Sequence, residues 1–121
     1  MATTDTTTFD VAALKRGIEE RDAQTLTALF AEDGELSVVD GEHPPSRPTV
    51  VRGRQEIGTY YADVCGRDME HRLERVLVNG DQAAFVQECR YPTGERVTCI
   101  AALDLEGGRI VRLNGIQAWD A

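Results

Sequence analysis

The stretch Arg21-Asp22-Ala23-Gln24-Thr25-Leu26-Thr27-Ala28-Leu29-Phe30-Ala31-Glu32-Asp33-Gly34 predicts a short helix that ends on a glycine. Asp22 can accept a hydrogen bond from the free N–H groups at the helix start, and Gly34 tolerates a left-handed exit. One face of this helix is apolar and consists of Leu26, Leu29 and Phe30. A helix of this length is marginal in water, so its apolar face must be packed against the rest of the chain. A strand is predicted directly after it, over residues 35–39.

The composition is that of one globular domain. Among 121 residues, 41% are apolar and 28% are charged, which is ordinary for such a domain. The formal net charge is −8, and a surface of this sign repels phosphate backbones, so nucleic acid is not expected as a partner. The domain is expected over residues 10–121, after a disordered lead over residues 1–9.

Cysteine usage and hydropathy bear on location. The chain has three cysteines and no C-x-x-C pair, so neither a disulfide framework nor a zinc knuckle is predicted. Residues 1–8 have no basic residue and no apolar run, so no secretory signal is expected there. No stretch approaches the roughly 20 apolar residues of a membrane span. The cytoplasm is the expected location, with no membrane partner.

The remaining elements follow from periodicity and from turn residues. Val11, Leu14 and Ile18 recur at helical spacing, and Asp10 or Thr8 can cap the helix that they predict, which should end near Arg21. Prolines and a glycine make residues 41–48 a loop. A short strand is expected over residues 50–52, a helix over 54–65, and four antiparallel strands over 70–79, 82–91, 95–105 and 109–119. Helices followed by a meander predict an α+β domain.

Four short motifs, in their order and spacing, resemble the SnoaL-like and ketosteroid-isomerase-like superfamily, which includes nuclear transport factor 2. They are Leu29-Phe30-Ala31-Glu32-Asp33-Gly34, Gly53-Arg54-Gln55-Glu56-Ile57, Gly80-Asp81-Gln82-Ala83 and Gly107-Gly108-Arg109-Ile110-Val111. The resemblance covers roughly residues 10–120. It implies a cone-shaped half-barrel in which three N-terminal helices pack on a curved, mostly antiparallel sheet around one pocket. It also implies a small hydrophobic molecule as ligand, no cofactor, and a homodimer that pairs through the outer sheet face.

Strand alternation predicts which side chains line such a pocket. If Phe85 points inward, its strand also contributes Gln87, Cys89 and Tyr91, and the later strands contribute Cys99, Leu113, Gln117 and Trp119. The helix over residues 54–65 supplies Tyr60 and Tyr61. Asp40 leaves the first strand and His71 enters the third. We expect the site at the wide mouth between this helix and the meander.

Asp40, His71 and Tyr61 are the candidate catalytic residues. An aspartate beside an apolar cavity could have a raised pKa and move protons, although Asp40-Gly41 could also simply begin a loop. Histidine titrates near neutral pH without help, although a lone histidine at a strand end is more often a surface or core residue. Asp40 or His71 would be the base, and Tyr61 or Gln87 would bind the substrate oxygen.

Two further readings concern thiols and metals. Cys89 or Cys99 could form a nucleophile–base pair with His71, whereas a buried cysteine usually behaves as a small hydrophobe. The two histidines lie 28 residues apart without metal-ligand spacing, so no metal is predicted.

The residues of the steroid isomerases themselves are not carried over. Val38 stands where the resemblance expects the catalytic aspartate, Leu14 where it expects a tyrosine, and Ala101 where it expects a second aspartate. Two hypotheses therefore remain. The first is an enzyme that isomerises, cyclises or dehydrates a cyclic molecule, or opens an epoxide, by proton transfer. The second is a non-catalytic ligand-binding or dimerisation module of the same fold.

Overall fold

The computed structural model describes residues 8–120, and these form three helices and six strands. Residues 1–7 of the expected lead lie outside this range. The elements in chain order are α1 (Val11–Glu19), α2 (Ala23–Ala28), β1 (Phe30–Val39), β2 (Thr49–Arg52), α3 (Arg54–Cys65), β3 (Glu70–Asn79), β4 (Gln82–Arg90), β5 (Arg96–Glu106) and β6 (Arg109–Trp119).

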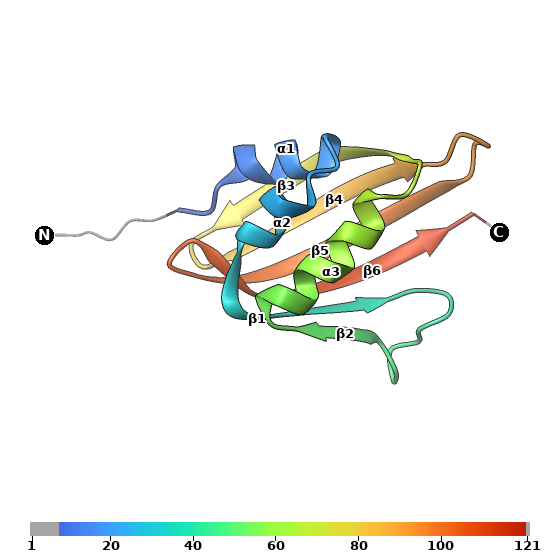
Figure 1. Cartoon of the computed structure of the whole chain (residues 1–121). Helices are drawn as coiled ribbons and strands as arrows, with labels where there is room; N and C mark the ends of the chain where they lie inside the picture. The colour runs from blue at the N-terminus through green and yellow to red at the C-terminus, as the bar shows by residue number, and fades with distance from the viewer. Residues whose placement is uncertain (1–7, 121) are drawn as a thin grey trace, which may run out of the picture.

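The strands form one sheet in the order β2-β1-β6-β5-β4-β3. Among the described strands only the β1–β6 pair is parallel, so the sheet is mostly antiparallel, as predicted. The sheet is curved and unclosed, and the three helices lie on its concave face (Figure 1). The predicted α+β half-barrel is therefore confirmed, with α3 inserted after the first two strands.

The helix starts and the tight turns follow the sequence signals. Asp10 accepts a hydrogen bond from the Ala13 N–H at 2.9 Å and caps α1, and Asp22 accepts one from the Thr25 N–H at 3.2 Å and caps α2. Gly80 has φ +63°, which a tight β3–β4 hairpin requires and which glycine adopts without strain.

The end of the second helix departs from the prediction. Helix α2 ends at Ala28, and Phe30 already begins β1, so Gly34 lies inside a strand and not at a helix exit. The pairing of β1 with β6 explains why a glycine stands here. Phe30 pairs with Ile110 and Glu35 pairs with Arg112, so β1 has more residues than β6 between these two pairs and forms a bulge. A Cβ on Gly34 would lie 3.0 Å from the Ile110 carbonyl oxygen. The close approach of the two strands therefore requires a small residue at this position. A left-handed backbone is not the reason, because the φ of Gly34 is not positive.

The main core lies between the helices and the concave face. Its largest fully buried side chains are Phe30, Leu36, Ile57, Leu103 and Ile110. Phe9 belongs to it with only 6% exposure, so the packed structure begins inside the segment expected to be a lead.

The convex face of the sheet carries apolar side chains that none of the three described helices covers. Ile100 and Ile116 are directly paired across β5 and β6 and are 53% and 62% exposed. The register continues this row to Val86 on β4 and Val39 on β1.

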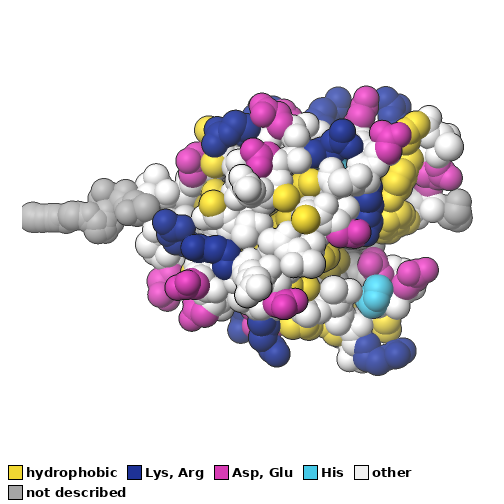
Figure 2. All heavy atoms as spheres, in the orientation of Figure 1, with side chains coloured by type: hydrophobic (Ala, Val, Ile, Leu, Met, Phe, Trp, Pro, Cys, Tyr) yellow, Lys and Arg dark blue, Asp and Glu magenta, His cyan; other side chains and the backbone are white. Residues whose placement is uncertain are grey.

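On the face seen in Figure 2, acidic and basic side chains are interspersed. None of the helices in residues 8–120 is long and apolar enough to cross a membrane.

Candidate functional site

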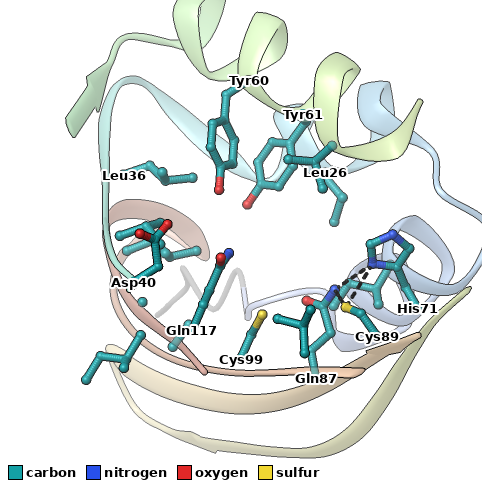
Figure 3. Close-up of a pocket in the computed structure, with 18 of the residues that line it drawn as sticks. Leu26, Leu36, Asp40, Tyr60, Tyr61, His71, Gln87, Cys89, Cys99 and Gln117 are labelled. Atoms are coloured by element: carbon teal, nitrogen blue, oxygen red, sulfur yellow. Dashed lines mark hydrogen bonds between the residues drawn. The ribbon is translucent and has the colours of Figure 1, made fainter. Parts of the chain in front are cut away.

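A cavity of about 330 Å³ lies between the concave sheet face and the helices. Its walls are largely apolar, and they include Leu26, Leu29, Leu36, Phe85, Ile110 and Leu113. A mostly apolar pocket with a few polar groups is the usual form of a small-molecule site. The polar groups that face it come from α3, from the end of β1 and from strands β3 to β6 (Figure 3).

Two tyrosine hydroxyls enter the cavity from α3. Tyr60 and Tyr61 point their hydroxyls away from the helix axis into the space above the sheet (Figure 3). Their rings meet edge to face with centroids 5.4 Å apart, which fixes both side chains. Burial raises the pKa of Tyr60 to about 12 and raises that of Tyr61 further, so both stay protonated. Within residues 8–120 neither hydroxyl has a hydrogen-bond partner, so both are available to a ligand oxygen.

Asp40 lines the cavity on the side of Gln117, across from His71 (Figure 3). Its Oδ1 accepts hydrogen bonds at 2.9 Å from the backbone N–H groups of Glu42 and His43, and His43 Nδ1 lies at the same distance. Burial alone would raise the pKa of Asp40, but the bonds from His43 and Glu42 outweigh it and lower the pKa. The expected raised pKa is therefore wrong. Asp40 is a carboxylate whose Oδ2 has no hydrogen bond among the described residues.

His71, Gln87 and Cys89 form a second polar group on the opposite side. The Nδ1 atom of His71 lies 2.9 Å from Gln87 Nε2 and 3.2 Å from Cys89 Sγ, and the same amide nitrogen lies 3.2 Å from that sulfur. The register places the three together, because His71 pairs with Cys89 across β3 and β4, and Gln87 lies two residues earlier on the same face. The Nε2 atom of His71 is buried without a partner among residues 8–120.

Cys99 on β5 affects the pKa of the Cys89 thiol. It pairs with Gln87 in the sheet register, so its thiol lies diagonally from Cys89. The Cys99 thiol is the largest cause of a lowered pKa at Cys89, burial opposes it, and His71 and Gln87 lower the pKa further. The pKa of Cys99 itself is raised by Cys89 and by burial. Of the two thiols, Cys89 is therefore the one that loses its proton more readily.

The structure places some of the other predicted lining residues at the cavity and one outside it. Leu113, Gln117 and Trp119 line the cavity, and the Trp119 Nε1–H donates to Gln117 Oε1 at 3.1 Å. Tyr91 lies outside the cavity because its strand has ended at Arg90, and its ring packs beside Trp119 at 6.0 Å between centroids.

The structure adds His43, which was not among the candidate site residues. Its side chain is exposed, but it lines the cavity, and its Nδ1 atom lies 2.9 Å from Asp40 Oδ1. Its position three residues after an aspartate at a strand end was the available signal. No group of three or more metal-binding side chains occurs in the described part of the chain.

Comparisons with known proteins identify the family. The family model of the SnoaL-like domain matches residues 11–113, so the chain belongs to this family. A comparison with curated proteins gives no match.

Solved structures of similar fold come from several bacteria. A nuclear transport factor 2-like protein of unknown function from Mesorhizobium loti has 20% identity and a TM-score of 0.76, with 88% of this chain and 86% of that chain covered. A candidate ketosteroid isomerase from Kribbella flavida has 19% identity and a TM-score of 0.72, covering 92% and 75%. A protein of ketosteroid isomerase-like fold from Catenulispora acidiphila, in complex with trimethylamine, has 20% identity and a TM-score of 0.64, covering 87% and 82%. At these identities the likeness establishes the fold alone.

Proposed function

We propose that this protein binds a hydrophobic, cyclic small molecule through one of its oxygen atoms and moves a proton on it. The observation that carries the proposal is that two tyrosine hydroxyls and one carboxylate oxygen, all without a hydrogen-bond partner among residues 8–120, face the same apolar cavity. The tyrosines can donate to a carbonyl oxygen and stabilise the negative charge that develops on it. Asp40 Oδ2 can accept the proton from the neighbouring carbon.

This division of roles fits several reactions of one class. Isomerisation, aldol cyclisation and dehydration can each begin with removal of a proton next to a carbonyl group. We assign the base to Asp40 rather than His71, because Nδ1 of His71 is engaged with Gln87 and Cys89 as an acceptor, which leaves the ring proton of the neutral imidazole on Nε2. A carboxylate with a lowered pKa is a weaker base, but it is ionised throughout the neutral range.

Binding is tested with a matched pair of ligands that differ in one oxygen. 2-Acetylnaphthalene is an apolar ketone, and 2-ethylnaphthalene has nearly the same shape without the oxygen. Tyr61→Phe should weaken the ketone about 3- to 10-fold, the value of one net hydrogen bond, and leave the hydrocarbon unaffected. Tyr91→Phe is the control, because this phenol lies outside the cavity. Equal effects of Tyr61→Phe on both ligands in titration calorimetry would refute the hydrogen bond.

Proton transfer is tested with 5-nitrobenzisoxazole, a general probe for a base in an apolar site. Removal of the proton on its ring carbon breaks the N–O bond and releases a coloured phenolate. Asp40→Asn should lower the rate by about 10²-fold or more. Since the pKa of Asp40 is lowered from 3.8, the wild-type rate should stay flat through neutral pH and fall only below that value. A rate that survives in Asp40→Asn and disappears in His71→Gln would transfer the role of base to His71.

The second candidate is a ligand-binding module without catalysis. One observation that favours it is the structural role of Asp40, whose Oδ1 accepts hydrogen bonds from the backbone of the turn after β1. Another is the buried Ala101, which stands where a second acid was expected. Under this alternative 2-acetylnaphthalene binds, whereas the benzisoxazole opens no faster than in buffer.

We also propose a homodimer built on the convex sheet face. The support is the exposed apolar row of Ile100 and Ile116, which no helix covers within the described residues. Two-fold pairing of identical chains is the commonest assembly and would bury this row. The cytoplasm remains the location that the sequence predicts.

A further inference from the structure

The group of His71, Gln87 and Cys89 has no part in the proton transfer assigned to Asp40. Its geometry is nevertheless that of a nucleophile with a proton partner: the imidazole nitrogen lies 3.2 Å from the sulfur, and an amide nitrogen lies 3.2 Å from the same sulfur. A nucleophile within hydrogen-bond reach of a base that a third group orients is the general signature of covalent catalysis.

We propose that Cys89, with His71 as its proton partner, forms a reversible covalent bond to the β carbon of an α,β-unsaturated carbonyl compound in the cavity. This inference rests on the proposed function only in that both use the same cavity. It assigns a chemical class of ligand, a cyclic enone, to the side of the cavity opposite Asp40 (Figure 3).

The step balances without an oxidant or cofactor. The Cys89 thiol gives its proton to His71 Nδ1, and the sulfur forms a bond to the β carbon. The carbon–carbon π pair moves toward the carbonyl and leaves an enolate oxygen, to which a tyrosine hydroxyl of α3 can donate. The imidazolium then returns the proton to the α carbon, so the net change is addition of S–H across the double bond.

Gln87 orients both partners of this step. In the resting pair its N–H groups donate to His71 Nδ1 and to the Cys89 sulfur. Once the proton has moved to Nδ1, only the sulfur can accept from the amide, and this bond stabilises the thiolate. No other titratable side chain of the described residues is hydrogen-bonded to His71; Cys99 faces the sulfur from β5.

The alternative is that Cys89 is an inert core thiol. It is only 5% exposed and packs with Met69 and Val97 in a small apolar cluster. The packing of an inert core thiol does not, however, account for an imidazole nitrogen and an amide nitrogen that both lie 3.2 Å from its sulfur, and a histidine beside a thiol is typical of reactive cysteines. Cys65 is the internal comparison, because it also lines the cavity but burial raises its pKa and it has no such partners among residues 8–120.

The test is alkylation of the full reduced chain by cyclohex-2-enone, read by intact mass and by peptide mapping. One adduct is expected, on Cys89. An ordinary thiol of pKa about 8.5 is only about 1% thiolate at pH 6.5. The pKa of Cys89 is lowered and that of Cys65 is raised, so a larger fraction of Cys89 is thiolate at this pH. Cys89 should therefore react at least about 10-fold faster than Cys65. The urea-unfolded chain should lose that preference.

Variants distinguish activation of Cys89 by His71 from simple accessibility of the Cys89 thiol. Cys89→Ser should abolish the adduct, whereas Cys65→Ser, the matched thiol control, should keep it. His71→Gln should slow the reaction about 10-fold at pH 6.5 and move its pH profile upward, and His71→Asn gives the same readout if the first variant does not fold. An unchanged rate and profile in a folded His71 variant, or preferential labelling of Cys65 or Cys99, would overturn the proposal. Failure of 2-acetylnaphthalene to bind would instead refute the proposed function. The two failures can be told apart, because mapping of the enone adduct does not depend on binding of this ketone.

Discussion

Gly34→Ala should destabilise the protein, although glycine-to-alanine changes in extended structure normally do the opposite. An added Cβ would lie 3.0 Å from the Ile110 carbonyl oxygen, 3.1 Å from the Ala31 carbonyl oxygen and 3.1 Å from a ring carbon of Phe30. Two of these atoms are backbone and the third belongs to one of the most buried side chains in the core. None of them can move without shifting the β1–β6 pair.

The size of the effect follows from this crowding. Overpacking a core position costs about 1 to 3 kcal/mol, and alanine recovers only about 0.4 to 1 kcal/mol by restricting the unfolded chain. The net loss should be about 1 to 2 kcal/mol, which for a domain of this size lowers Tm by roughly 4 to 8 °C. Gly41→Ala is the matched control, because nothing lies within 4 Å of its added Cβ and its φ is not left-handed. This second variant should be neutral or slightly stabilised.

The measurement is urea unfolding followed by circular dichroism, with all three proteins at one concentration because dimerisation would also affect stability. A Gly34→Ala protein as stable as the wild type would show that the strand pair has room at this position. Equal losses in Gly34→Ala and Gly41→Ala would show that the effect is not due to crowding.

Three further outcomes follow from the structure. Sedimentation of the wild type should give about twice the 13.3 kDa chain mass, and Ile116→Asp should give the monomer, because a charge would be buried in the apolar row of the convex face. A wild-type monomer at micromolar concentration would remove the dimer. Asp40 has a lowered folded-state pKa, so its contribution to stability is present above its ordinary value of 3.8 and is lost as the pH falls through the folded value. Asp40→Asn should therefore flatten the acid limb of the unfolding curve, and an unchanged limb would contradict the role of the His43 and Glu42 bonds. The rate of isomerisation of a Δ5-3-ketosteroid should stay at background, because Val38, Leu14 and Ala101 replace the groups that this reaction is expected to need. Clear turnover would show that this assignment of positions is wrong.

Local signals predicted most of the fold because each acts within a few residues. Asp10 and Asp22 cap the helices that follow them, and Gly80 makes the turn that its sequence predicts. The error at Gly34 has a different origin. Leu29 and Phe30 continue the helical pattern, but the carbonyl of Leu29 accepts from the Ile110 N–H at 2.9 Å, across 81 residues of chain. Pairing with β6 thus ends the helix early, and no local pattern contains that information.

The candidate site was predictable as a set of residues but not as an arrangement. Alternation correctly placed Gln87, Cys89 and Cys99 on the concave face, and the helix pattern placed both tyrosines above it. Sequence parity cannot give the strand order, in which β6, β5 and β4 lie between β1 and β3 and so put Asp40 and His71 on opposite sides of the cavity (Figure 3). Nor can it reveal that the register brings Cys89 against His71, because this contact depends on the β3–β4 pairing.

That separation of Asp40 from His71 limits what the protein can do in a single step. Because they lie on opposite sides of the cavity, we expect each to act on its own part of a ligand (Figure 3). The tyrosine hydroxyls lie between them in the close-up view and can serve a carbonyl oxygen approached from either side (Figure 3). A cyclic enone satisfies both sides at once, because its β carbon is electrophilic and its γ carbon carries an acidic proton. A saturated ketone can use only the Asp40 side. The relative response of Asp40→Asn and Cys89→Ser to these two ligands therefore measures whether the cavity works as one site or as two.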